Sequence, residues 1–110
     1  MKTSYFGKSG QHPNAVSIAA ITPSWFRKRI YKKFAPPWNL VKRYKDGQVT
    51  EEQYKRTYQK EILSKLDPKQ VAEELGQEAI LLCYEKSGQF CHRHLVADWF
   101  QRAGIKVEEI

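Results

Sequence analysis

The residues best suited to chemistry lie close together in the last third of the sequence. They offer two thiols, a carboxylate, two imidazoles and a guanidinium, and they are Cys83, Glu85, Cys91, His92, Arg93 and His94. Such groups can bind an anion, move a proton or attack a substrate. The pattern Cys-x-Glu-x5-Cys-His-Arg-His therefore marks the candidate site.

The two cysteines have different surroundings. Cys91 stands beside His92 and Arg93 at the start of a predicted helix, a setting that lowers a thiol pKa and favours a nucleophilic thiolate. The alternative is that Cys91 is a small buried apolar residue. Cys83 ends an apolar run, so we expect a core residue whose sulfur borders the ligand. Two cysteines are too few for a disulfide scaffold, and we expect both to be reduced.

Glu85 is the strongest candidate for a catalytic group. A carboxylate after a buried strand can hydrogen-bond a ligand hydroxyl or act as a general base. The alternative is a structural ion pair with Arg93, which could otherwise grip a phosphate or carboxylate with two parallel hydrogen bonds. We name Glu85, Cys91 and His92 as candidate catalytic residues.

The same side chains are of the types that bind zinc, and the set would be Cys83, Cys91, His92 and His94. Their spacing matches no common paired ligand pattern, and the adjacent Cys91 and His92 would rarely reach one metal. The two histidines are two positions apart, so on a helix they point in different directions. The prediction is that there is no metal site.

Strands and helices must alternate to position these residues. Continuous apolar runs predict strands over 15–21 and 79–83, and shorter patterns predict strands over 3–6 and 105–110. Helices are predicted over 24–34, over 38–45, after the capping box of Thr50 and Gln53, after Asp67-Pro68, and over 91–103. The alternation indicates an α/β fold over residues 1–110, a small three-layer Rossmann-like domain with a mostly parallel sheet of about four strands. The eight-residue link between the first two strands leaves open whether they are non-adjacent or joined by an irregular loop.

In open α/β sheets, ligands bind beyond the carboxyl ends of the strands. The loop over 84–90, in which Gly88 gives room to turn, leads into a helix N-terminus that favours an anion. Three strand ends and this helix start converge in the predicted site. Its expected ligand-binding residues are Tyr5, Thr22, Trp25, Cys83, Glu85 and Arg93.

The charge of the chain is distributed unevenly. The 110 residues contain 19 Lys and Arg against 12 Asp and Glu, a formal net charge of +7. Residues 1–45 contain ten basic and no acidic residues, whereas residues 46–110 contain nine basic and twelve acidic ones. This asymmetry suggests a phosphate-bearing partner. Aromatic residues interleave with the basic ones over 25–34, where they would either stack on bases or belong to the core. No apolar run could span a membrane and no signal peptide is recognisable, so we expect a cytoplasmic protein.

The segment ILLCYEKSGQFCHRHLVADWF resembles the signature of the domain of unknown function 488 (DUF488) family. TSYF, SIAAITPSWF, APPW and YQKEILSKLDP are similar to a compact branch of that family from bacteria and phages. The resemblance implies a small Rossmann-like α/β domain in which Cys83, Glu85, Cys91, His92 and Arg93 are the motif positions. It implies no activity, and a helix that longer members have between the first two strands is missing here.

Three functions are compatible with the sequence, and we rank them in this order. The first is binding of a phosphate-bearing ligand, a nucleotide or nucleic acid, at the strand edge and the loop over 84–93. The second is an enzyme that acts on such a ligand through Glu85, Cys91, His92 and Arg93. The third is a protein-interaction or ligand-sequestering module, phage-encoded if the resemblance holds, that contacts its partner through residues 25–38. The sequence names no cofactor and no oligomeric state.

Overall fold

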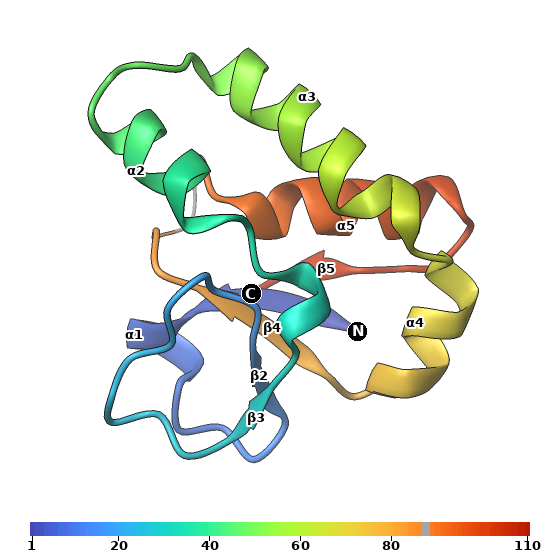
Figure 1. Ribbon diagram of the computed structural model, residues 1–110. Helices are drawn as coiled ribbons and strands as arrows, with labels where there is room; N and C mark the ends of the chain where they lie inside the picture. The colour runs from blue at the N-terminus through green and yellow to red at the C-terminus, as the bar shows by residue number, and fades with distance from the viewer. Residues whose placement is uncertain (87–88) are drawn as a thin grey trace.

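A computed structural model describes residues 1–86 and 89–110. Its centre is a parallel five-stranded sheet in the order β3-β2-β4-β1-β5 (Figure 1). The strands are β1 Lys2–Tyr5, β2 Ala15–Ser17, β3 Arg29–Ile30, β4 Ile80–Cys83 and β5 Glu108–Glu109. The helices are α1 Phe6–Ser9, α2 Trp38–Lys45, α3 Glu51–Glu61, α4 Pro68–Leu75 and α5 His92–Arg102, with 3-10 turns at Lys32–Phe34 and Leu63–Lys65. The predicted α/β class with a parallel sheet is confirmed, with one strand more than expected.

Strand β4 is the middle of the sheet because all four of its residues are apolar and can be buried on both faces. It pairs with β1 on one side, where Cys83 is level with Tyr5, and with β2 on the other, where Leu82 is level with Ser17. The first two strands of the chain are therefore not adjacent, which settles the alternative left by their short link. This order brings the carboxyl ends of three strands to one edge.

The two faces of the sheet are covered unequally. Val16 and Leu81 point into a large cluster with side chains from α2, α3, α4 and α5. Ile80 and Leu82 point the other way into a smaller cluster with Phe6 of α1 and Phe26. Figure 1 shows the long helices α3 and α5 on one side of the sheet and α1 on the other. The third layer of the fold is thus a single helical turn and the 18–28 connection.

The prediction of a helix over 24–34 is wrong. Arg29 and Ile30 instead pair with Val16 and Ser17 as the edge strand β3. The aromatic side chains of this segment go to opposite sides of the sheet, Phe26 to the small cluster and Phe34 to the large one. One short helix could not place Phe26 and Phe34 on opposite faces of the sheet, so the chain between them is extended.

The later helices begin where the sequence predicts. Thr50 Oγ1 accepts a hydrogen bond from the Gln53 N–H at 3.1 Å, and the Gln53 side chain accepts one from the Thr50 N–H at 2.8 Å. Asp67 caps α4 through the N–H of Lys69, with Pro68 in the first turn. These signals are local, which is why they can be recognised without knowledge of the fold. Within the described part of the chain, the helices all fall short of the length and apolar character that crossing a membrane requires.

Candidate functional site

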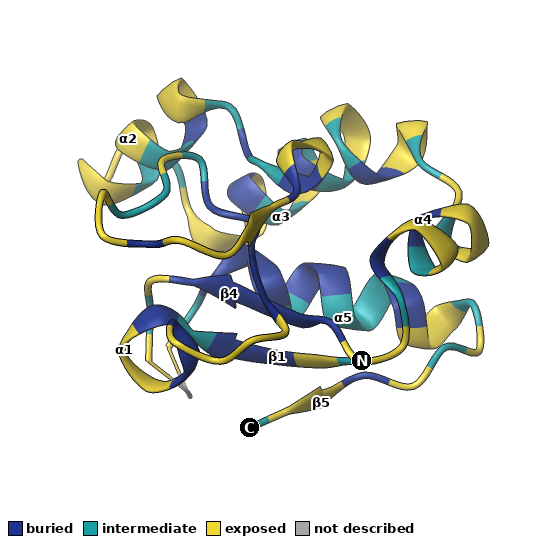
Figure 2. Cartoon of the chain, turned by 90° about the horizontal axis from the view of Figure 1, so that it is seen from below, coloured by how far each residue is buried: buried dark blue, intermediate teal, exposed yellow. Residues whose placement is uncertain are grey.

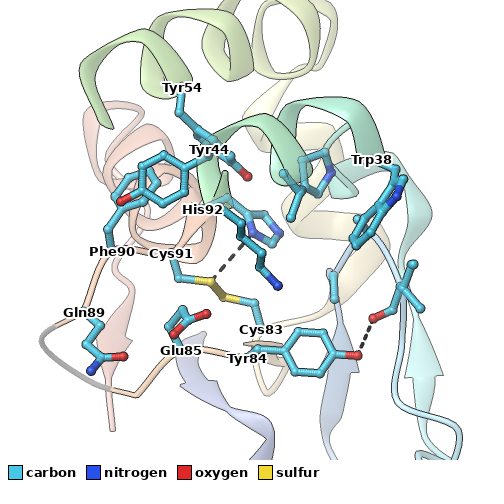
Figure 3. Close-up of a pocket in the computed structure, with 16 residues that line it drawn as sticks. Trp38, Tyr44, Tyr54, Cys83, Tyr84, Glu85, Gln89, Phe90, Cys91 and His92 are labelled. Atoms are coloured by element: carbon cyan, nitrogen blue, oxygen red, sulfur yellow. Dashed lines mark hydrogen bonds between the residues drawn. A yellow bond between two sulfur atoms is a disulfide. The ribbon is translucent and has the colours of Figure 1, made fainter. Parts of the chain in front are cut away.

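A pocket of about 480 Å³ opens at the carboxyl ends of β2 and β4 (Figure 3). Four segments surround it: the chain after β2, helix α2 with the proline before it, one residue of α3, and the connection from β4 into α5. Its described lining residues are Ala19, Ala20, Ile21, Pro36, Trp38, Val41, Tyr44, Lys45, Tyr54, Cys83, Tyr84, Glu85, Gln89, Phe90, Cys91 and His92. The strand-edge location predicted from the sequence therefore holds a real cavity.

Aromatic rings form much of the wall. Tyr44, Tyr54 and Phe90 contact one another with ring centroids 5.2–5.5 Å apart, which fixes α2 against α3 and the entry to α5. Tyr84 donates a hydrogen bond from its hydroxyl to the carbonyl of Ile21 at 2.6 Å. Trp38 is half exposed at the mouth. The sequence places Tyr84 and Phe90 in the loop at the predicted site, but it gives no indication that Trp38, Tyr44 and Tyr54 reach the pocket from α2 and α3. A tryptophan directly after Pro36-Pro37 is the one signal in the sequence that could have pointed to Trp38.

The base of the pocket is a disulfide between Cys83 and Cys91, so the expectation that both cysteines are reduced is wrong for this state. The backbone brings the end of β4 and the start of α5 together, which places the two sulfur atoms side by side despite the loop between them. A disulfide sulfur is no thiolate, so the nucleophile considered at Cys91 would require prior reduction.

His92 is buried beside this disulfide (Figure 3). Its Nε2 lies 2.6 Å from the carbonyl oxygen of Ile18, so Nε2 carries the proton and Nδ1 is left bare. Burial lowers the pKa of His92 from 6.5 to about 4, against the opposing effect of that hydrogen bond. The imidazole is therefore neutral at neutral pH, with a lone pair on the nitrogen that lies 3.8 Å from Cys91 Sγ.

Arg93 is fully buried and pairs with Glu109, not with Glu85. Its Nε and Nη2 donate to the two carboxylate oxygens of Glu109 at 3.1 and 2.9 Å. Its Nη1 donates to the backbone carbonyl of Glu85 at 2.6 Å and to Cys83 Sγ at 3.2 Å. The alternative prediction of an ion pair between Glu85 and Arg93 is therefore wrong, because Arg93 contacts only the backbone carbonyl of Glu85. Arg93 ties the end of β4 to β5, and the side chain of Glu85 is left to face the pocket.

A family model described as DUF488-N3a, an active DUF488-N3 subclade, matches residues 7–104. The chain belongs to the DUF488 family. Neither the curated proteins nor the solved structures include one that matches it. The resemblance read from the cysteine-containing segment is confirmed at the level of the family.

Four of the five positions that the resemblance assigns to the DUF488 motif line the pocket of this domain: Cys83, Glu85, Cys91 and His92. The fifth, Arg93, lies behind them. We expected that the adjacent side chains of Cys91 and His92 could rarely reach one metal ion, but in the structure they point to the same place. A ligand atom from each of Cys83, Cys91 and His92 falls within 4.8 Å of the others, and all three residues are buried. His94 points elsewhere, as predicted, with its Nε2 3.1 Å from the carbonyl of Gln89.

The other predicted ligand-binding residues lie apart from the main pocket of the DUF488 domain. The hydroxyl of Thr22 is within 2.7 Å of the Ser17 hydroxyl. Trp25 packs edge-on against Phe6 and borders a second hollow of about 390 Å³ formed with residues 6–12. Tyr5 ends β1 and lines neither hollow. Of the six predicted ligand-binding residues, the structure therefore places Cys83 and Glu85 in the main pocket and Trp25 at the second hollow. The prediction for Gly88 lies outside the described residues.

Part of the basic aromatic segment over 25–34 is structural. Arg29 donates to the carbonyls of Glu74 and Leu75 at the end of α4, and Lys33 forms an ion pair with Glu74 at 2.9 Å. Tyr31 and Phe34 are in the core, which favours the core interpretation for these rings. Among the described lining residues of the pocket, Lys45 and Glu85 supply the charges.

Proposed function

We propose that this DUF488 domain binds a nucleotide or the exposed end of a nucleic acid, with a base in the pocket and phosphate at the α2 side. The observation that carries the proposal is the aromatic pocket of about 480 Å³ at the carboxyl edge of the parallel sheet. Its size is within the range of small-molecule sites, and this edge is where open α/β sheets bind ligands.

The wall suits a flat ring. Trp38 and Tyr84 are each about half exposed, so they present ring surface that the described residues leave partly uncovered. Stacking of a base on an aromatic side chain contributes about 1–3 kcal/mol and needs no particular base. Glu85, in the same wall, offers carboxylate oxygens that can accept hydrogen bonds from ribose hydroxyls.

The charge on the α2 side suits phosphate. Helix α2 contains Lys42, Arg43 and Lys45 and no acidic residue, and Lys45 lines the pocket itself. A phosphate beyond the mouth would meet this positive field, and the +7 charge of the chain would attract the ligand over a longer distance. Affinity should therefore fall as salt is raised.

Titration with AMP, ATP and a short oligothymidylate at low and high salt tests the proposal, with isothermal titration calorimetry as the readout, because it also measures binding to a variant that lacks Trp38. Trp38→Ala and Lys45→Gln should each weaken binding about tenfold or more, because they remove the stacking surface and the nearest cation. Lys32→Gln is the matched control, since Lys32 is exposed and outside the pocket. Absence of binding at low salt for all three ligands would reject the proposal.

Catalysis in the same pocket is a second candidate, favoured by the word "active" in the description of the matching subclade. Glu85 is the residue placed to take a proton from a bound ligand or water, because its side chain faces the cavity while Arg93 engages Glu109. Cys91 and His92 stay candidate partners. Incubation with nucleotides and oligonucleotides, followed by chromatography of the products, tests this. Turnover that Glu85→Gln leaves unchanged would exclude Glu85 as the base.

A further inference from the structure

We propose that reduction of the Cys83–Cys91 disulfide converts the base of the pocket into a zinc site. The ligands would be Cys83 Sγ, Cys91 Sγ and His92 Nδ1. The proposal is independent of nucleotide binding, because it rests on the three buried ligand atoms that gather within 4.8 Å.

The spacing of the donors fits a zinc ion. Zn²⁺ binds thiolate sulfur at about 2.3 Å and imidazole nitrogen at about 2.0–2.1 Å, so two such ligands in a tetrahedral site are about 3.6 Å apart. Cys91 Sγ and His92 Nδ1 are 3.8 Å apart. The two adjacent residues therefore present their donor atoms at the separation that a shared ion requires.

The imidazole is already held in the form that a metal needs. Because His92 Nε2 donates to the carbonyl of Ile18 at 2.6 Å, the lone pair is on Nδ1, the nitrogen nearer to Cys91. Histidines that bind metals usually donate their other ring N–H to a carbonyl or carboxylate in this way, which fixes both tautomer and orientation. Tyr58 packs against the ring from α3 with centroids 5.5 Å apart.

A second outer contact suits a thiolate at Cys83. Arg93 Nη1 lies 3.2 Å from Cys83 Sγ, and a guanidinium donor stabilises negative charge on sulfur. Arg93 is itself fixed by Glu109, so this donor is positioned before any metal arrives. The two pairings, Ile18 with His92 and Arg93 with Cys83, make this a built site rather than a chance grouping.

The fourth coordination position would open into the pocket, because all three ligand residues line it. Zinc sites with three protein ligands and one open position bind water or substrate there, whereas structural zinc sites are closed by four protein ligands. The chemistry that a bound zinc ion would supply at this position is polarisation of an oxygen ligand from the pocket.

Metal binding and the disulfide exclude each other. A dithiol reductant gives two electrons to the S–S bond and becomes a disulfide itself, and Cys83 and Cys91 become thiols. Zinc binding then displaces the two thiol protons to the solvent, because thiolates are the ligands. The oxidised protein has no such ligand to offer, so the disulfide form is the metal-free form.

Cobalt(II) is the probe for the test, because a tetrahedral thiolate site gives it visible d–d bands and a near-ultraviolet charge-transfer band. The reduced protein should take up about one equivalent, release about two protons per ion, and lose both bands when Zn²⁺ is added. The protein with its disulfide intact should give neither band. Cys83→Ser and Cys91→Ser should abolish the charge-transfer band or weaken binding at least about tenfold.

His94→Gln is the matched control for His92→Gln, because His94 lies on the same helix but engages Gln89. We expect His94→Gln to bind cobalt normally and His92→Gln to lose the tetrahedral spectrum. If circular dichroism shows that His92→Gln does not fold, the two cysteine variants and the proton count decide. A reduced protein without cobalt bands, or cysteine variants that keep them, would overturn the proposal.

Discussion

Arg93 is the side chain that links the site to the far edge of the sheet. A lysine in its place keeps the charge but cannot donate to both oxygens of Glu109, to the Glu85 carbonyl and to Cys83 Sγ. We expect Arg93→Lys to lower the free energy of unfolding by roughly 2 kcal/mol, less than loss of a wholly buried pair because Glu109 is partly exposed. Urea denaturation measures this. Arg102→Lys, in an exposed ion pair with Asp98, should change the value little; equal effects of the two variants would refute the reasoning.

Position 10 requires glycine because the Trp25 ring and the backbone of Phe6 lie too close to leave room for a side chain. A Cβ at this position would lie 2.4 Å from the Trp25 ring and 2.6 Å from the Phe6 carbonyl oxygen, and the carbonyl belongs to a backbone that cannot swing away. We expect Gly10→Ala to destabilise the fold by about 1–3 kcal/mol in thermal or urea unfolding. Gly7→Ala is the control, since its Cβ would meet Tyr5 at an ordinary 3.4 Å. A Gly10→Ala protein as stable as the Gly7→Ala protein would contradict the steric account.

At the scale of single residues, the sequence predicts the site only where a local pattern exists. Cys83, Glu85, Cys91 and His92 flank one loop, so their convergence follows from a strand that ends beside a helix start. The partner of Arg93 is Glu109 in β5, which is 16 residues away in the sequence. No local pattern links the two residues, so the sequence does not predict this pair. The rings of Tyr44 and Tyr54 reach the pocket only through packing between helices.

Helix α3 is held to the rest of the fold by Tyr58, which is buried and donates its hydroxyl to the Phe34 carbonyl at 2.6 Å. Burial, with a smaller contribution from Tyr54, raises the pKa of Tyr58 well above 10. Above pH 10 the unfolded chain releases this proton while the folded chain retains it, so the free energy of unfolding should fall as pH rises.

Tyr58→Phe tests that coupling. The variant should lose about 1 kcal/mol at pH 8, because the hydrogen bond is absent, and should show a shallower decline between pH 9 and about 11. Urea denaturation at several pH values measures both quantities. Identical slopes for the two proteins would mean that Tyr58 is not the group responsible.

At the scale of elements, helices with their own start signals are predictable and elements defined by pairing are not. The capping residues of α3 and α4 are close together in the sequence, so a local pattern is enough to predict where these helices begin. Strand β3 consists of two exposed residues, Arg29 and Ile30, which show no alternation and become a strand only because β2 offers an edge. Strands β2 and β5 are shorter than the sequence predicts. The neighbouring apolar residues Ile18, Ala19 and Val107 are buried although they lie outside the strands.

At the scale of the whole molecule, the two-residue strand β5 covers one edge of the sheet. Figure 2 shows β5 as an exposed segment along the edge of strand β1, whose middle residues are buried. Removal of residues 108–110 would leave the edge of β1 unpaired and would take Glu109 away from Arg93. We expect a lower unfolding midpoint and concentration-dependent association, since an uncovered strand edge pairs with other chains.

Urea denaturation and light scattering after size-exclusion chromatography measure these two effects. Glu108→Ala is the control, because it keeps the strand and removes only an exposed pair with Lys106. A truncated chain that remains as stable and as monodisperse as the Glu108→Ala protein would show that β5 is dispensable.

The two sides of the pocket differ in how firmly they are anchored. The base of the pocket lies at the end of the central strand β4, in which every residue is buried. The opposite side is formed by α2, in which Leu40 is the one buried residue. Local opening takes least free energy where few apolar contacts break. Amide hydrogens of α2 should therefore exchange with deuterated solvent well before those of β4, and an occupant of the pocket would slow exchange chiefly along that helix.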